Sequence, residues 1–219
     1  MLRMLLSALF MMFFAVGCGP RYVDYFPNHD DGTPKPKVAL LPILDSSNGK
    51  LPWNISEELS QSIYDDLMDS GKLYVLPPNE LGVPQNISAD CFGGNLDFLR
   101  NFHDTDFVVA LELIKHSTTP CKEAPPPGGA AAGYLNCRYV LDLQMRVRIL
   151  DIRNPSNPRT ILYEITKTSY KISPPESGVN YDKITWSSSA FRSTPCGIAH
   201  QRLVQNLTAR MEDIIRSAN

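Results

Sequence analysis

The feature that most constrains the fold is a long alternation of apolar and polar residues from Tyr139 to Ile152. Six apolar side chains occupy every second position of this run, and four of the intervening side chains are polar or charged. Successive side chains of a β-strand point to opposite sides, so the pattern predicts a strand with one side in a core and the other in water. The alternation resumes from Ile161 to Ile165, after a turn at 154–158. The two runs together predict a long antiparallel hairpin.

Two amphipathic helices supply the apolar surface that such a sheet needs. Pro52 and Asn54 are start signals for the first helix, and Gly71 is its stop signal. Thr194 and Pro195 begin the second helix, near the end of the chain. The apolar residues that recur at helical spacing are Ile55, Leu59, Ile63 and Leu67 in the first helix and Leu203, Leu207 and Met211 in the second.

Three shorter apolar runs predict additional strands. Residues 38–44 and 73–76 flank the first helix, so a right-handed strand–helix–strand crossover is the expected unit. The run at 107–114 extends the same sheet. The fold class predicted from this order is α/β (α+β), a mixed β-sheet with a long antiparallel hairpin and amphipathic helices packed mainly on one face.

The N-terminus is typical of a bacterial lipoprotein signal. Thirteen uncharged residues, 4–16, follow Arg3, a length that suits a signal peptide and is too short to span a bilayer as a helix. Residues 15–18, Ala-Val-Gly-Cys, resemble the box in which a lipid-transferring enzyme alkylates the cysteine, here Cys18, and a peptidase cuts before it. An ordinary signal peptidase also accepts these small residues, which leaves an exported protein without a lipid as the alternative.

This signal sets the predicted domain organisation and location. Residues 1–17 form the signal peptide, 18–36 the lipidated cysteine and a flexible tether, and 37–219 a single periplasmic α/β domain. Gly19 and Pro20 follow the cysteine, where an aspartate would commonly retain a lipoprotein in the inner membrane. The predicted location is therefore the bacterial envelope, lipid-anchored at the outer membrane and facing the periplasm.

The cysteine count fits an oxidising compartment. The chain has five cysteines, and an acylated Cys18 leaves four, the number needed for two disulfides. Cys121 and Cys137 lie at the two ends of a loop rich in proline, glycine and alanine, so we expect them to pair. Cys91 with Cys196 is then the remaining pair, although four cysteines allow three connectivities.

The order of elements and several short phrases resemble the domain shared by CsgG-type secretion lipoproteins, LpoB-type activators of penicillin-binding proteins and the N-terminal domain of TolB. The phrases are residues 37–45, 69–76, 106–113 and 145–151, and the similarity covers most of residues 37–217. The resemblance implies an envelope component that acts by binding partners, as an adaptor or assembly factor.

The sequence contains no recognisable catalytic, cofactor or metal signature. The polar turn 45–49 has one glycine and no Gly-Lys-Ser pattern, so a plain strand-to-helix loop is expected there. The four histidines are distant from one another in sequence and are expected on the surface or in loops: His29, His103, His116 and His200. We therefore predict no enzyme activity, no cofactor and no metal.

The predicted function is a membrane-anchored, non-catalytic binding or assembly factor, with an envelope protein or peptidoglycan as partner. Removing residues 1–17 removes one of the 21 basic residues, Arg3, and none of the 23 acidic ones, which gives no electrostatic reason to bind nucleic acid. The alternative is a CsgG-like oligomeric export channel subunit, because the hairpin has the alternation of paired barrel strands. The loop 117–136 is either a docking element or an insertion without a role.

Overall fold

The computed structural model describes residues 26–81, 90–121, 137–173 and 176–218. These residues form one six-stranded sheet in the order β3-β1-β4-β5-β6, and β2 also pairs with β4. The strands are β1 (Lys37–Leu40), β2 (Leu44–Asp45), β3 (Tyr74–Val75), β4 (Phe107–Pro120), β5 (Tyr139–Asp151) and β6 (Arg159–Ile172). The helices are α2 (Ile55–Ser70), α3 (Ser189–Arg192) and α4 (Pro195–Ala218), and the 3-10 turns are η1 (Asp90–Phe92), η2 (Asp97–Asn101), η3 (Glu176–Gly178) and η4 (Tyr181–Lys183). None of the helices in these ranges combines the length and the apolar character needed to cross a membrane.

The sheet is mixed, which confirms the predicted fold class. Strand β1 runs parallel to both of its neighbours, β3 and β4, and α2 lies between β2 and β3 in the chain. Strands β4, β5 and β6 are successively antiparallel, and β2 is parallel to β4. The predicted hairpin is confirmed as β5 and β6, which pair from Tyr139 with Ile172 to Asp151 with Arg159.

Helix α2 begins and ends, and helix α4 begins, where the sequence signals predict. The side chain of Asn54 caps α2 by accepting hydrogen bonds from the backbone N–H groups of Ser56 and Glu57. Gly71 ends α2 with φ 65°, a left-handed conformation that suits glycine. Helix α4 begins at Pro195, which has no backbone N–H to leave unpaired at this position.

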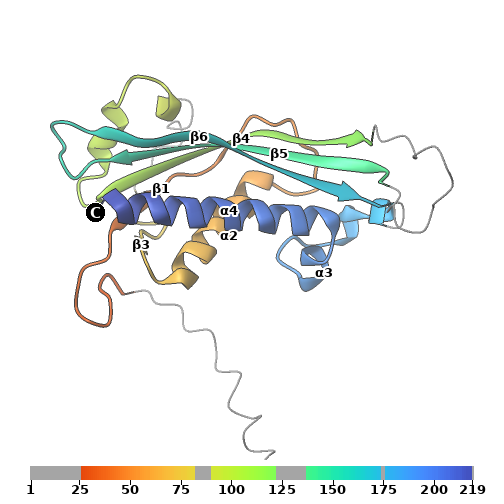
Figure 1. Cartoon of the computed structure of the whole chain (residues 1–219), viewed down its shortest axis with the longest axis horizontal. Helices are drawn as coiled ribbons and strands as arrows, with labels where there is room; N and C mark the ends of the chain where they lie inside the picture. Colours follow the sequence, from red (N-terminus) through yellow and green to blue (C-terminus); the bar gives the residue numbers. More distant parts are fainter. Residues whose placement is uncertain (1–25, 82–89, 122–136, 174–175, 219) are drawn as a thin grey trace, which may run out of the picture.

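The two faces of the sheet are covered differently, as Figure 1 shows. Helices α2 and α4 lie on one face and bury the main core there. Toward one end of the sheet, the opposite face is covered by the segment that contains η1 and η2, which forms a second, smaller core. Tyr163 and Ile165 in β6 lie on that opposite face and are 55% and 46% exposed. The predicted arrangement of helices mainly on one face is confirmed.

Part of the segment assigned from sequence to the tether is held by hydrogen bonds. The backbone N–H of Lys35 donates to the carbonyl of Pro27, and the N–H of His29 donates to the carbonyl of Thr33. The Lys35 side chain is 2% exposed. Residues 27–35 therefore form a hydrogen-bonded turn whose last residue, Lys35, is buried, while residues 18–25 lie outside the described ranges.

Candidate functional site

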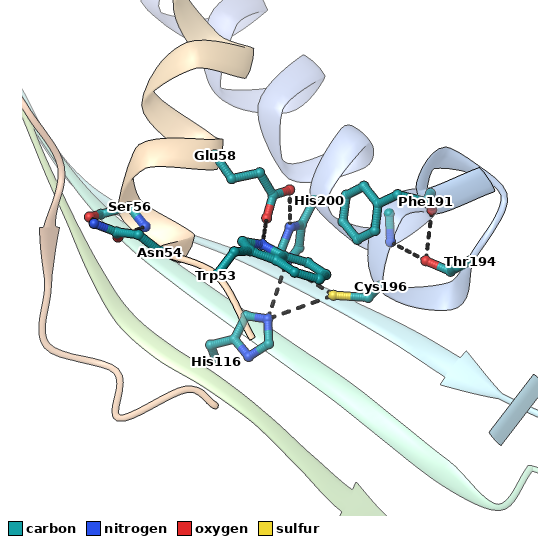
Figure 2. Close-up of polar contacts among 10 residues, drawn as sticks. Trp53, Asn54, Ser56, Glu58, His116, Phe191, Thr194, Cys196 and His200 are labelled. Carbon is teal, nitrogen blue, oxygen red and sulfur yellow. Dashed lines mark hydrogen bonds and ion pairs between the residues drawn. The ribbon is translucent and has the colours of Figure 1, made fainter. Parts of the chain in front are cut away.

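Three side chains with acid–base or metal-ligand chemistry meet between the sheet and the helices (Figure 2). His116 comes from β4, and Cys196 and His200 come from α4. The Nε2 atoms of the two histidines lie 3.0 Å apart. The Sγ atom of Cys196 lies 3.4 Å from Nε2 of His200 and 3.9 Å from Nε2 of His116. We call these three residues the histidine–cysteine cluster; their exposed fractions are 9%, 4% and 3% for His116, Cys196 and His200.

The start of α4 positions two members of the cluster. Cys196 and His200 are four residues apart, a spacing that places both on one face of a helix. The hydroxyl of Thr194 accepts a hydrogen bond of 3.0 Å from the backbone N–H of Gly197, which fixes the first turn. The cluster therefore sits at a capped helix end, where little backbone freedom remains.

A β-bulge in β4 positions the third member, His116. The register with β5 shifts between Leu113 and Lys115, so Ile114 is an extra residue in β4. Leu113 lies in the core under the helices, and so does Leu143, the residue of β5 that pairs with His116. Without the extra residue, simple alternation from Leu113 would turn His116 toward the opposite face of the sheet.

Glu58 of α2 connects the cluster to a second layer of hydrogen bonds (Figure 2). Its Oε1 lies 2.6 Å from Nδ1 of His200, and its Oε2 accepts a 2.8 Å hydrogen bond from Nε1 of Trp53. The Glu58 side chain is 2% exposed. A buried carboxylate is costly unless its oxygens are bonded, and here both oxygens have a donor. Glu58 therefore fixes the orientation of the His200 ring.

Aromatic rings and a close turn enclose the cluster. Phe191 packs edge-on against the His200 ring at 5.9 Å and against Trp53 at 5.2 Å between ring centroids. On the other side, the polar turn that follows β2 approaches through Gly49, where an added Cβ would lie 3.0 Å from Nδ1 of His116. The turn that the sequence analysis treated as a plain loop therefore forms a wall of the cluster.

The pKa values of His116 and His200 are shifted in opposite directions. Burial, together with the neighbouring His200, lowers the pKa of His116 to about 4. Burial also acts to lower the pKa of His200, but hydrogen bonds with Cys196 and Glu58 outweigh it and raise the pKa to about 10. The raised pKa favours the charged form of His200, in which Nδ1 faces Glu58 and Nε2 faces both Cys196 and His116.

The structure corrects the histidine prediction in part. His103 is exposed, as predicted, whereas His116 and His200 are in the core and adjacent to each other. One signal for the site was present in the sequence, because Cys196 and His200 share a helical face with Leu203. No pattern near His116 indicates the bulge that brings it there.

The two predicted disulfides have different outcomes. The bond between Cys121 and Cys137 is confirmed, with 5.9 Å between the Cα atoms. The predicted bond between Cys91 and Cys196 is wrong, because these two buried cysteines are not joined to each other. They lie in the two separate cores, on opposite faces of the sheet, so the sheet itself keeps the sulfurs apart. Cys18 lies outside the described residues, as does most of the loop 117–136.

A cleft of about 560 Å³ opens beside the end of β1. It lies between α2 and the chain that follows β3. Its floor includes Leu41 and Ala110, its walls include Tyr64, and its rim carries Glu57 and Gln61 of α2. A concave, mainly apolar surface with a few polar groups at its edge is the general form of a binding site.

The long hairpin is used within the core of this chain. The apolar face of β5 packs beneath α4, which runs along the hairpin in Figure 1. A CsgG-like channel subunit would need that apolar face to be free for the lipid. The packing against α4 therefore argues against the channel alternative.

Several solved structures resemble this chain. A hypothetical protein from Chlamydia trachomatis, CT253, is 28% identical with a TM-score of 0.66, and the match covers 84% of this chain and 99% of that one. Lipoprotein GNA1162 from Neisseria meningitidis is 16% identical with a TM-score of 0.44, covering 81% and 99%. A minor lipoprotein from Acinetobacter baumannii is 13% identical with a TM-score of 0.35, covering 81% and 92%.

Of these three, the Chlamydia structure is similar enough to support an argument, and it supports the fold. The lipoprotein structures are more distant neighbours, and none of the three is a CsgG-, LpoB- or TolB-type protein by name, so that part of the resemblance stays a prediction. No protein of curated function matches the sequence. A family model described as a family of unknown function, DUF7499, matches residues 24–219.

Proposed function

The chain belongs to the DUF7499 family, whose function is unknown, and we propose that it is a non-catalytic binding or assembly factor of the bacterial cell envelope. In this proposal, a lipid on Cys18 anchors the protein at the outer membrane, and the α/β domain faces the periplasm. The support for the anchor is the signal segment and the Ala-Val-Gly-Cys sequence at 15–18. The anchor confines the domain to a thin layer beside the membrane, which raises its effective concentration toward partners there.

The observation that carries the binding role is the cleft beside β1. Its volume of about 560 Å³ falls within the range of sites that bind ligands or short segments of a partner. The apolar lining of the cleft provides affinity through burial, at roughly 25 cal/mol for each Å² of apolar surface removed from water. The polar residues of α2 on the rim, Glu57 and Gln61, fix the orientation of the bound segment through polar contacts.

The chemistry of the cleft favours a segment of an envelope protein over peptidoglycan. A glycan presents many hydroxyl groups, each of which needs a hydrogen-bond partner when it is buried, and the floor of this cleft is apolar. A short protein segment with apolar side chains satisfies the floor, and a basic residue beside it would pair with Glu57 on the rim. We therefore propose an apolar segment with an adjacent basic residue as the partner's contact.

Photo-crosslinking in the native organism tests this proposal. The photoreactive residue p-benzoylphenylalanine replaces Gln61, which is exposed on the rim of the cleft. The matched control replaces Gln205, an exposed glutamine on α4 outside the cleft. We expect one discrete adduct from position 61 and none from position 205. Mass spectrometry of the adduct then identifies the crosslinked segment and its composition.

Two additional variants make the test decisive. Glu57→Trp fills the mouth of the cleft from an exposed position and should abolish the adduct at position 61 while the protein stays folded. Cys18→Ser should release the protein from the membrane and reduce the adduct. Equal adducts at positions 61 and 205, or an adduct that persists in Glu57→Trp, would overturn the assignment of the cleft. A crosslinked glycan would overturn the choice of partner.

A further inference from the structure

The histidine–cysteine cluster takes no part in the proposed binding at the cleft, and its geometry points to a separate metal-binding site. We infer that His116, Cys196 and His200 form a binding site for Zn²⁺. The inference differs from the sequence expectation that no metal is bound, and it does not depend on the proposed function. It stands on the types of the three ligand atoms, their separations and the hydrogen bonds that support His200.

The separations of the three ligand atoms match a tetrahedral Zn²⁺. With Zn–N bonds of about 2.0–2.1 Å and a Zn–S bond of about 2.3 Å, tetrahedral angles set N···N at about 3.3 Å and N···S at about 3.6 Å. In the cluster the N···N separation is 3.0 Å, and the N···S separations are 3.4 Å and 3.9 Å. Each separation agrees within about 0.4 Å with the tetrahedral value. The cluster therefore needs only small side-chain movements to hold the ion.

The three ligand atoms lie close together between β4 and the start of α4, as Figure 2 shows. Nε2 of His116, Nε2 of His200 and Sγ of Cys196 lie within 4.8 Å of one another. On binding, the thiol proton and the proton between the two imidazoles pass to solvent, and the ion takes their place. Three protein ligands leave one coordination position for water or another small ligand.

Glu58 provides the support that a zinc-bound histidine needs. A histidine that binds zinc through Nε2 usually donates its Nδ1–H to a carboxylate or carbonyl, which fixes the tautomer and the ring plane. Nδ1 of His200 makes that contact with Glu58 at 2.6 Å, and Trp53 in turn donates to the other carboxylate oxygen. The negative charges of the Cys196 thiolate and the Glu58 carboxylate balance the two positive charges of the ion.

The ligand types select the class of metal. A thiolate and two imidazoles suit Zn²⁺ and disfavour Mg²⁺ and Ca²⁺, which prefer oxygen ligands. Cys196 is a buried thiol without a disulfide partner. Packing alone would be served by an apolar side chain at this position, whereas metal coordination requires the sulfur of Cys196.

Metal titration of the purified full chain tests the inference. The protein is stripped with a chelator under nitrogen and titrated with Co²⁺, which takes the same tetrahedral sites and reports a thiolate ligand through a charge-transfer band. We expect one equivalent of Co²⁺ to give that band, and Zn²⁺ to displace it at a stoichiometry of one. Zn²⁺ should also raise the midpoint of thermal unfolding, because it binds the folded state.

Matched variants distinguish Zn²⁺ binding at the histidine–cysteine cluster from nonspecific binding elsewhere on the protein. Cys196→Ser and His116→Gln should each remove the charge-transfer band or weaken Zn²⁺ binding at least 100-fold. Cys91→Ser, at the other buried thiol, and His103→Gln, at an exposed histidine, should bind Zn²⁺ as the parent protein does. Glu58→Gln should weaken Zn²⁺ binding roughly 10- to 100-fold at unchanged stoichiometry.

The inference fails under clear conditions. Absence of the Co²⁺–thiolate band in the parent protein, together with an unchanged unfolding midpoint in Zn²⁺, would overturn it. Binding that persists in the double variant Cys196→Ser, His116→Gln would show that the ion binds elsewhere and would also overturn it. Circular dichroism of each variant checks that it is folded, and His116→Gln, at the more exposed ligand, keeps the test valid if Cys196→Ser does not fold.

Discussion

The substitution Gly197→Ala sets two physical effects against each other at the start of α4. Alanine is a better helix former than glycine by about 1 kcal/mol, so propensity alone predicts a more stable protein. In the structure, however, a Cβ built on Gly197 would lie 2.1 Å from the carbonyl oxygen of Phe191. Real Cβ atoms do not approach a backbone atom so closely, so one of the two segments must move by about 1 Å.

That carbonyl cannot move without losing other interactions. It accepts hydrogen bonds from both the backbone N–H and the hydroxyl of Thr194, at 2.8 Å and 2.7 Å. Overpacking of a well-packed site costs about 1–3 kcal/mol, and a lost buried hydrogen bond adds about 1 kcal/mol. After the gain in propensity is subtracted, we expect Gly197→Ala to lower the free energy of unfolding by about 2 kcal/mol.

Urea unfolding followed by circular dichroism measures this change. With an m-value of about 2 kcal/mol/M, a loss of that size lowers the unfolding midpoint by about 1 M. Gly94→Ala is the control, since no atom lies within 4 Å of a Cβ at that position, and it should shift stability by no more than about 0.5 kcal/mol. A Gly197→Ala protein that is as stable as the parent, or more stable, would refute the close packing of α4 against Phe191.

Three additional outcomes are expected. Hydrogen bonds from Arg153 lower the pKa of Asp151 to about 2. The ionised Asp151 therefore stabilises the fold above about pH 4, and this stabilisation is lost as the pH falls toward 2. Asp151→Asn should reduce the difference in unfolding free energy between pH 7 and pH 2 by about 2 kcal/mol. Replacing Cys121 and Cys137 with serine opens a crosslink with a sequence separation of 16 and should lower the unfolding free energy by about 3 kcal/mol in urea. Intact-mass analysis of the membrane-extracted protein should find a diacylglycerol addition on Cys18 that is absent from the Cys18→Ser variant.

The parts of the fold that could be predicted from sequence depend on local patterns. The alternation along β5 gave the hairpin, and Asn54, Gly71 and Pro195 gave the limits of the helices, because each acts on its own neighbours in the chain. The pairing of Cys121 with Cys137 was also local, since the two flanking strands bring the ends of one loop together.

The candidate site could not be predicted in the same way, because it depends on register between distant segments. Strict alternation in β4 would place His116 on the same face as Glu112, away from the helices, and the bulge at Ile114 reverses this. The Cys91–Cys196 prediction failed for a related reason. Elimination by counting ignores the sheet that lies between the two thiols.

The cost of the histidine–cysteine cluster argues that it has a role beyond packing. The core around it is otherwise apolar, and apolar side chains of similar volume would commonly give equal or greater stability than a buried ionic group. Here His200, Glu58 and Trp53 satisfy one another, but the Nε2 atoms of the two histidines remain directed at each other and at a thiol. In a purely structural core, leucine side chains at these positions would stabilise the fold at least as well as the three polar groups do. A cation at the point of convergence uses all three ligand atoms at once, which is the property that the Co²⁺ and Zn²⁺ titrations measure.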